Sequence, residues 1–350
     1  MCAWLAGPPG NPSSVHAAGR RARAAVEAAR RQVAQAVGVA PGELIFTSGA
    51  TEALHLAILG AVPRGGHVVV SAVEHPAVFG ACAVAEARVS VVPVDGAGRL
   101  LPADVAAAVR PDTALVAVMA AQNELGTLYP VAEIARAVGA PLLCDAAQAL
   151  GRVPVDLPSL GAALAVFSAH KLGGPAGAGA LWVRPGMALR PTLAGGPQER
   201  GRRAGTEAVA ALVGFGAAAA LVPRRLAGMA GVVALRDRLE AGLAAMPGVI
   251  FHGNQGVRLP NTSAWRFEGV MGDVLLAALD LEGFCLSSGS ACSAGAVEPS
   301  PVLRALGLGP AEAGGGLRAS LGPENTAAEV DALLAVLPRL VARARQVGPC

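Results

Sequence analysis

The sequence contains a single lysine: Lys171 is one of 28 basic residues, and the other 27 are arginines. Aromatic residues make up only 3% of the 350 residues and charged residues 15%, and the formal net charge is +3. No basic run with interleaved aromatic residues occurs, although that pattern is typical of nucleic-acid binding. The sequence therefore predicts no nucleic-acid partner.

Long apolar runs are also absent. The longest, from Ala208 to Val222, is shorter than the about 20 residues of a membrane span and contains two glycines. Residues Met1 to Gly10 lack the basic start and the apolar stretch of a signal peptide. We therefore expect a soluble, cytoplasmic protein without a membrane partner, long enough for two domains.

Cysteines are few, and none of the six forms a C-x-x-C pair. Neither a zinc site nor a disulfide framework is therefore predicted. Five cysteines stand in apolar or terminal contexts, where buried apolar filler or an unstructured end is the preferred interpretation. Cys292 is the exception, because its neighbours are small and polar and an accessible, nucleophilic thiol is expected there.

The single lysine is informative because arginine serves a solvated surface as well as lysine does. A guanidinium stays protonated, so arginine cannot act as a nucleophilic amine or move a proton. A lysine that survives among 27 arginines marks a position where arginine does not suffice, with chance survival as the alternative. The residues around Lys171 have to decide between the two.

Short apolar segments alternate with helical patterns through the first two thirds of the chain. Val-, Leu- and Ala-rich strands separated by helices predict an α/β fold with a mostly parallel sheet covered on both faces. The seven predicted strands cover residues 43–47, 67–72, 89–94, 114–120, 142–145, 164–168 and 180–183.

The pattern changes after Thr206 and predicts a smaller α+β domain. Its expected elements are a long helical stretch over about 207–246, strands at 249–252, 262–267 and 317–321, and helices at 273–281 and 326–345. We therefore predict a large domain over residues 1–225 and a small domain over residues 226–350, which carries Cys292.

Candidate site residues gather where the predicted strands end. In an open α/β sheet the ligand lies beyond the carboxyl ends of the strands, so these residues are expected to meet. They are Ser48, Gly49, Ala50, Thr51, Glu74, His75, Asn123, Asp145, Ser168, His170 and Lys171.

Several of these residues suit an anionic, aromatic cofactor. Free amides and a hydroxyl at the helix start near Thr51 would bind phosphate, with an ordinary N-cap as the alternative. Asp145 ends an apolar strand, where a carboxylate is costly unless it meets a positive group such as a pyridinium nitrogen. A helix cap or an arginine partner is the alternative for Asp145. Lys171 precedes a glycine-rich loop, which suits an amine that forms a Schiff base.

Three further side chains have a functional interpretation, and two of them also have a structural one. His75 is either a ring stacked on a flat cofactor or a surface-loop histidine. Gln148, three residues after Asp145, would reach the same ligand. Arg318 would clamp a substrate carboxylate in bidentate fashion, although any one of so many arginines is more often structural.

Seven stretches in chain order resemble the cysteine desulfurases, class-V relatives of the aminotransferases among the fold-type I pyridoxal-phosphate enzymes. One short motif would be a weak signal, whereas seven in order are specific. The match runs from Gly10 to about Leu337. Its stretches are FTSGATE (46–52), NELG (123–126), DAAQ (145–148), SAHK (168–171), ERGRRAGT (199–206), SSGSAC (287–292) and EPSPVLRALG (298–307).

The resemblance implies how pyridoxal 5'-phosphate would be bound. Lys171 would carry it covalently, Asp145 would pair with its pyridine nitrogen, Gln148 with its phenolic oxygen, and His75 would stack on its ring. Thr206 would reach into the site of a partner subunit, which implies a homodimer. The other implied cofactor-binding residues are Gly49, Ala50, Thr51, Asn123, Ser168 and His170.

The resemblance also implies the reaction. Asn123 and Arg318 would receive the carboxylate of L-cysteine, and Cys292 would accept its sulfur as a persulfide while L-alanine leaves. The long segment 287–306 is similar to the subgroup that serves iron–sulfur cluster assembly, so a scaffold protein is the implied acceptor and Cys292 a shared iron–sulfur ligand. Thio-cofactor assembly is the other implied destination of the sulfur.

The sequence departs from the family pattern near its start. No counterpart of the segment that usually precedes Gly10 is present, so we expect a truncated N-terminus, and Pro197 replaces a usual glycine. Three alternatives stay open: a selenocysteine lyase, another class-V pyridoxal-phosphate enzyme, and a truncated, inactive homologue.

Overall fold

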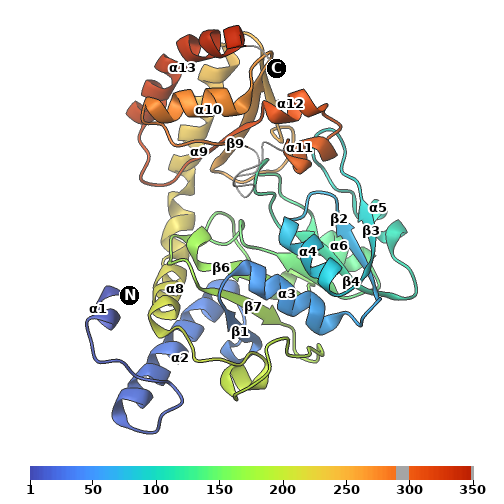
Figure 1. Cartoon of the computed structure of the whole chain (residues 1–350), viewed down its shortest axis with the longest axis vertical. Helices are drawn as coiled ribbons and strands as arrows, with labels where there is room; N and C mark the ends of the chain where they lie inside the picture. Colours follow the sequence, from blue (N-terminus) through green and yellow to red (C-terminus); the bar gives the residue numbers. More distant parts are fainter. Residues whose placement is uncertain (289–298, 348–350) are drawn as a thin grey trace. The chain divides into compact units, whose positions relative to one another are not determined.

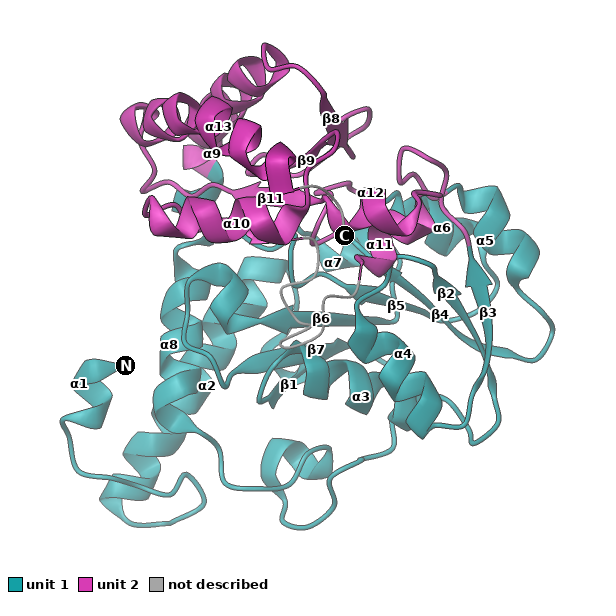
Figure 2. Ribbon diagram, turned by 45° about the horizontal axis from the view of Figure 1, so that its top comes forward, with its two compact units in different colours: residues 1–92, 101–120, 129–226 teal, residues 93–100, 121–128, 227–350 magenta. Residues whose placement is uncertain are grey.

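The computed structural model describes residues 1–288 and 299–347, which form two compact units (Figures 1 and 2). Unit 1 comprises residues 1–92, 101–120 and 129–226, and unit 2 comprises residues 93–100, 121–128 and 227–350. Sequence patterning placed a division between residues 225 and 226 and gave no sign of the two short segments that unit 2 takes from the first half of the chain.

Unit 1 contains a seven-stranded sheet with the strand order β1-β7-β6-β5-β4-β2-β3. Neighbouring strands from β3 to β6 pair in parallel, whereas β7 is antiparallel to both of its neighbours. The predicted α/β class with a mostly parallel seven-stranded sheet is thus confirmed. The strands are β1 (Leu44–Thr47), β2 (His67–Ser71), β3 (Arg88–Val92), β4 (Thr113–Met119), β5 (Leu142–Asp145), β6 (Leu164–Ser168) and β7 (Gly179–Val183).

Helices cover both faces of this sheet (Figure 1). Ile45 of β1 belongs to a core that includes residues of α3 and α4, while its neighbour Phe46 faces Phe215 of α8 with ring centroids 6.3 Å apart. Successive side chains of a strand alternate between faces, which explains the division. The helices are α1 (Cys2–Leu5), α2 (Ala17–Val37), α3 (Ala50–Ala61), α4 (Pro76–Val84), α5 (Pro102–Ala108), α6 (Val131–Ala137), α7 (Leu157–Leu160) and α8 (Val209–Ala220), with 3-10 turns η1 (Pro41–Glu43), η2 (Ala169–Leu172) and η3 (Gln198–Gly201).

The helical stretch expected over 207–246 is broken at Leu221. The helices α8 and α9 (Val222–Ala244) meet there at an angle of 57°. Pro223 lies in the first turn of α9, where its missing N–H is tolerated, but it cannot continue α8. Among the described residues no single helix is long and apolar enough to span a membrane, although the bent pair α8 and α9 meets the criteria of length and composition together.

Unit 2 contains a four-stranded antiparallel sheet with the order β10-β11-β9-β8. Its core joins apolar residues of α9, α10 and α13 to Trp265 and Phe267 of β9. The short strand β10 lies at one edge of the sheet. The elements are β8 (Val249–His252), β9 (Thr262–Phe267), α10 (Gly272–Leu281), β10 (Ser287–Ser288), α11 (Pro301–Ala305), α12 (Pro310–Gly314), β11 (Leu317–Ser320) and α13 (Ala327–Val347).

Candidate functional site

One edge of the sheet in unit 1 collects most of the predicted site residues. The strands β1, β2, β4, β5 and β6 run in the same direction, so their carboxyl ends share this edge. The residues that follow these strands therefore lie at this edge, as expected for an open α/β sheet. They are Gly49, Ala50 and Thr51 after β1, His75 after β2, Asp145 at the end of β5, Ser168 at the end of β6, and His170 and Lys171 in η2.

Asp145 is a buried carboxylate that interacts electrostatically with His75 and Lys171. The residue is only 8% exposed, and its Oδ1 accepts a hydrogen bond of 2.9 Å from the N–H of Ala147. Burial raises the pKa of Asp145, while the N–H of Ala147, His75 and Lys171 act in the opposite direction. Because a buried anion needs a positive partner, this carboxylate is suited to bind a cationic group of a ligand.

His75 is the N-cap residue of α4. Its Nδ1 accepts a hydrogen bond of 3.1 Å from the N–H of Ala77, which fixes the orientation of the ring. Burial, and secondarily the charge of Lys171, lower the pKa of His75, although Asp145 acts against this shift. The ring is therefore a neutral, oriented imidazole at neutral pH, as stacking on a flat cofactor requires.

The start of α3 offers backbone donors at this edge. The first turn of a helix leaves backbone N–H groups without intrahelical partners and carries the positive end of the helix dipole. Gly179 of β7 packs so closely that an added Cβ would lie 2.6 Å from the backbone of Gly49. Next to this turn, Ser168 Oγ and His170 Nδ1 are 2.9 Å apart, and burial and Lys171 lower the pKa of His170.

Glu52 connects this turn to the loop that carries Thr206, a role that the sequence did not reveal. Its Oε2 accepts from the N–H of Ser48 at 2.8 Å, and its Oε1 accepts from Arg203 at 2.7 Å. Thr206 itself is exposed and lies apart from the strand ends in sequence, between η3 and α8. Gln148 is half-buried in the turn after β5.

The two residues expected to bind a substrate carboxylate belong to unit 2. Arg318 of β11 donates a hydrogen bond of 2.6 Å from Nη1 to the backbone carbonyl of Asn123. Next to Asn123, Glu124 is buried and accepts a hydrogen bond of 2.5 Å from Ser300 Oγ. Burial raises the pKa of Glu124 to about 7, although Ser300 and Arg318 act in the opposite direction.

Replacing Ser300 with alanine is expected to destabilise unit 2. The change leaves the buried Glu124 without this donor and also removes the N-cap of α11, where Ser300 Oγ accepts from Leu303 N–H at 3.1 Å. Each loss costs about 1 kcal/mol or more, so unfolding in urea should show a decrease of about 1–3 kcal/mol. Ser320→Ala, at an exposed position of β11, is the matched control. Equal urea midpoints for the two variants would contradict the prediction.

The cysteines divide into buried and exposed ones. Burial raises the pKa of Cys82 to about 11 and also raises that of Cys144, so these thiols stay protonated, as expected for apolar filler. Cys292, with its predicted sulfur-acceptor and iron–sulfur-ligand roles, lies outside the described residues. The expectation that Cys285 is buried is wrong, because Cys285 is exposed on the segment that leads to the edge strand β10.

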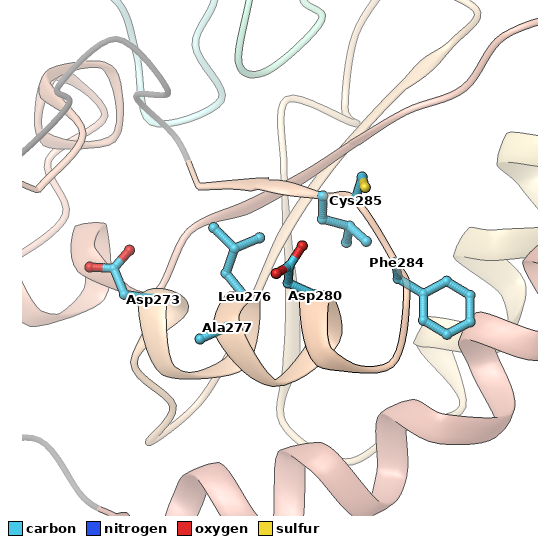
Figure 3. Close-up of a pocket in the computed structure, with 7 residues that line it drawn as sticks. Asp273, Leu276, Ala277, Asp280, Phe284 and Cys285 are labelled. Carbon is cyan, nitrogen blue, oxygen red and sulfur yellow. The ribbon is translucent and has the colours of Figure 1, made fainter.

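Cys285 lines a cavity of about 360 Å³ in unit 2. Figure 3 shows Asp273 and Asp280 on α10 and Cys285 on the extended segment that runs alongside this helix. Among residues 1–288 and 299–347, no three His, Cys, Asp or Glu side chains come together as metal ligands. This cavity is lined by Asp273, Leu276, Ala277, Asp280, Phe284, Cys285 and Leu286.

Comparison with known proteins relates both units to one group of enzymes. The family model for Aminotransferase class-V matches residues 5–333. A cysteine desulfurase of Cereibacter sphaeroides is 46% identical, over 97% of this chain and 90% of the relative. Cysteine desulfurase IscS 1 of Archaeoglobus fulgidus is 40% identical, over 97% of this chain and 92% of its own length. The solved structure of a NifS-like protein from Rickettsia africae has a TM-score of 0.89 and 30% sequence identity, and covers 97% of this chain and 94% of that chain.

Proposed function

Because this chain belongs to the cysteine desulfurases of the class-V aminotransferase family, we propose that it takes sulfur from L-cysteine and releases L-alanine. It is an enzyme of the transferase class with a fold-type I architecture. One observation supports the proposal most strongly: the single lysine of the sequence lies at the same sheet edge as a buried carboxylate and an open helix N-terminus.

The side chains at this edge fit pyridoxal 5'-phosphate, the cofactor of this family. Asp145 is a buried carboxylate at the end of β5, which suits the protonated ring nitrogen of the cofactor. The first turn of α3 and the pair Ser168 and His170 offer donors to a phosphate group. Lys171 is exposed, so its amine is accessible for covalent attachment.

When bound, pyridoxal phosphate supplies an aldehyde for attachment and a protonated ring that withdraws electrons from the substrate Cα. In the proposed mechanism Lys171 Nζ holds the cofactor at rest and takes the Cα proton during turnover. Asp145 would keep the ring nitrogen protonated, Gln148 would bind the phenolic oxygen, and His75 would stack on the ring. The phosphate would be bound by Thr51, Ser168 and His170, by the backbone of Gly49 and Ala50, and by Thr206 of a second copy in a homodimer.

The sulfur step is assigned to Cys292. Its thiolate attacks the sulfur of L-cysteine, so an S–S bond forms while the C–S bond breaks and its electron pair stays with the carbon. Protonation of that carbon gives L-alanine, and the enzyme keeps one persulfide. Asn123 and Arg318, which are joined in unit 2, are the proposed partners of the substrate carboxylate, since a guanidinium binds a carboxylate in bidentate fashion.

The acceptor of the persulfide is proposed to be a scaffold protein for iron–sulfur clusters, supported by the name of the Archaeoglobus relative. The proposed compartment is the cytoplasm. Its support is that Cys82, Cys144 and Cys285 are free thiols in the described part of the chain, as in reducing compartments.

The purified protein with added pyridoxal phosphate and a thiol reductant tests the proposed function. L-cysteine should yield equal amounts of L-alanine and sulfide, and the rate with L-cysteine should exceed the rate with L-selenocysteine. A faster reaction with L-selenocysteine would instead indicate the lyase alternative. Cofactor binding without any product from either substrate would indicate an inactive homologue.

Replacing Cys292 with serine is expected to leave cofactor binding intact and to abolish the persulfide. A serine hydroxyl is a poor nucleophile at neutral pH, so turnover should fall on the order of 10²-fold, the contribution of one catalytic group. Cys285→Ser is the matched control, because it removes an exposed thiol of the same unit without touching the proposed machinery. Persulfide is measured by mass spectrometry of the intact protein after one turnover. Undiminished turnover of Cys292→Ser would remove Cys292 from the mechanism.

A further inference from the structure

Glu74 is a buried carboxyl group with an asymmetric set of hydrogen bonds. It lies three residues after the end of β2 and is 5% exposed. Its Oε1 accepts hydrogen bonds from Ser71 Oγ at 2.6 Å and from Met119 N–H at 2.7 Å. Its Oε2 is equally buried, yet it has no hydrogen-bond partner among the described residues.

This asymmetry favours a neutral carboxylic acid over a carboxylate. An ionised carboxylate spreads its charge over both oxygens, so a buried oxygen without a donor is costly. A protonated acid has a carbonyl oxygen, which accepts both bonds here as Oε1, and a hydroxyl at Oε2. Burial raises the pKa of Glu74 to about 8, with Ser71 and Met119 acting against the shift and the charge of Asp145 adding to it.

The hydrogen bonds of Glu74 connect two strand ends of the candidate site, and one of these is paired with a third. Ser71 is the last residue of β2 and Met119 the last of β4, so Oε1 ties these two ends together. Met119 is also the register partner of Asp145 on β5. His75 is the next residue in the chain. The spacing between His75 and Asp145 therefore depends on this link.

The ionisable groups that face Glu74 are few. Asp145 and Cys144 of β5 both interact with it electrostatically, and burial keeps the Cys144 thiol protonated. If Glu74 and Asp145 were both ionised, two negative charges would share a buried edge with little compensation, which is strongly unfavourable.

We propose that Glu74 is a positioning residue which, as a neutral carboxylic acid, ties the ends of β2 and β4 together and leaves Asp145 as the one negative charge among Glu74, Cys144 and Asp145. The inference rests on the proposed function, because Asp145 is taken to be the partner of the cofactor nitrogen. It identifies Glu74 as the residue that keeps the charge on Asp145 and holds His75 and Asp145 at a fixed spacing.

The protonation of Glu74 is tested on the cofactor-free protein, so that failure of the proposed function does not affect the result. Folded Glu74 keeps a proton that the unfolded chain releases above its ordinary pKa of 4.5. The stability of the wild type should therefore fall relative to Glu74→Gln as the pH rises from about 4.5 to about 8, and not beyond. Urea midpoints measured across this range give the difference. Parallel curves for the two proteins would overturn the proposal.

Pyridoxal phosphate affinity tests the positioning role. Glutamine is neutral and keeps the acceptor for Ser71 and Met119, so Glu74→Gln should bind the cofactor within about twofold of the wild type. Glu74→Ala loses the link and should bind about tenfold more weakly or worse, as when a supporting group of a site is removed. Equal affinity of the alanine variant, or an equal loss in both variants, would overturn the role.

If Glu74→Gln does not fold, the infrared spectrum of the cofactor-free wild type is the second measurement. The carbonyl band of a buried, protonated carboxyl group should persist above neutral pH, disappear near pH 8, and remain in Asp145→Asn. Loss of this band in Asp145→Asn would show that Asp145 and not Glu74 holds the proton. Absence of the band from the wild type would show that neither carboxyl group is protonated. Either result would overturn the proposal.

Discussion

Replacing Lys171 with alanine is expected to lower the turnover of L-cysteine by at least about 10⁴-fold, because the proposed covalent attachment and the proposed base are lost together. The sequence offers no other lysine that could take over. Lys171 also lies close enough to Asp145 and His75 to influence the pKa values of both, so its amine belongs to the same site.

Lys171→Arg is the control that separates the effect of the positive charge from the effect of the reactive amine. Arginine keeps the positive charge near Asp145, but its guanidinium stays protonated and cannot attach an aldehyde or accept a proton. The arginine variant should therefore be as inactive as the alanine variant, while its folding stability stays closer to that of the wild type. Alanine production from L-cysteine measures activity, and urea unfolding measures stability. Activity of Lys171→Arg near the wild-type level would mean that only charge is needed at this position.

Replacing Glu199 with glutamine is expected to lower the free energy of unfolding by about 3–5 kcal/mol. Glu199 and Arg30 form a buried pair with two hydrogen bonds of 2.7 Å, and Glu199 Oε2 also accepts from the N–H of Phe46 at 2.9 Å. Side chains of the pair are 2% and 6% exposed. The glutamine would leave the buried guanidinium of Arg30 with only the more exposed Glu27, 3.2 Å from its Nε, as a counter-charge.

The same substitution should weaken cofactor binding through the loop that carries Thr206. Glu199 and Arg200 have positive φ angles of 47° and 60°, which non-glycine residues adopt only when surrounding contacts hold them. The ion pair with Arg30 is the buried contact that holds this turn.

An exposed ion pair provides the comparison for Glu199. Arg238 and Asp331 form a pair whose side chains are about half exposed, so Asp331→Asn should leave the urea midpoint nearly unchanged. The stability loss is measured by urea unfolding at neutral pH for both variants. A Glu199→Gln variant as stable as Asp331→Asn would show that the buried pair does not hold the loop.

The strands of unit 1 and the residues at their ends could be predicted because their signals are local. Each strand is a short, buried apolar run, and the parallel arrangement then requires the polar residues after these runs to share one edge. The sequence therefore predicts that one sheet edge carries Asp145, Ser168 and Lys171.

Contacts between residues distant in the sequence could not be predicted. Arg30 and Glu199 are 169 positions apart, and Arg203 and Glu52 are 151 positions apart. Among 27 arginines the sequence gives no means of choosing these partners. Glu74 was visible as an acidic residue before His75, but its bond to Met119 depends on the pairing of β2 with β4.

The exposure of Cys285 near the edge of a sheet could not be predicted from the sequence either. Cys285 stands in an apolar context, which favoured a buried thiol, yet it lies on the segment before the edge strand β10 and is exposed. The bend at Leu221 also escaped detection, because both flanking segments have helical patterns and only Pro223 interrupts them.

The attachment point of the cofactor is the most direct measurement. The protein is loaded with pyridoxal phosphate, treated with borohydride to fix the bond between cofactor and amine, digested after arginine, and mapped by mass spectrometry. The label should appear on the peptide that contains Lys171, at one cofactor per chain, and not on the N-terminal amine of Met1. A protein that binds the cofactor and yields no label on Lys171 would contradict the assignment of this lysine and, with it, the proposed function.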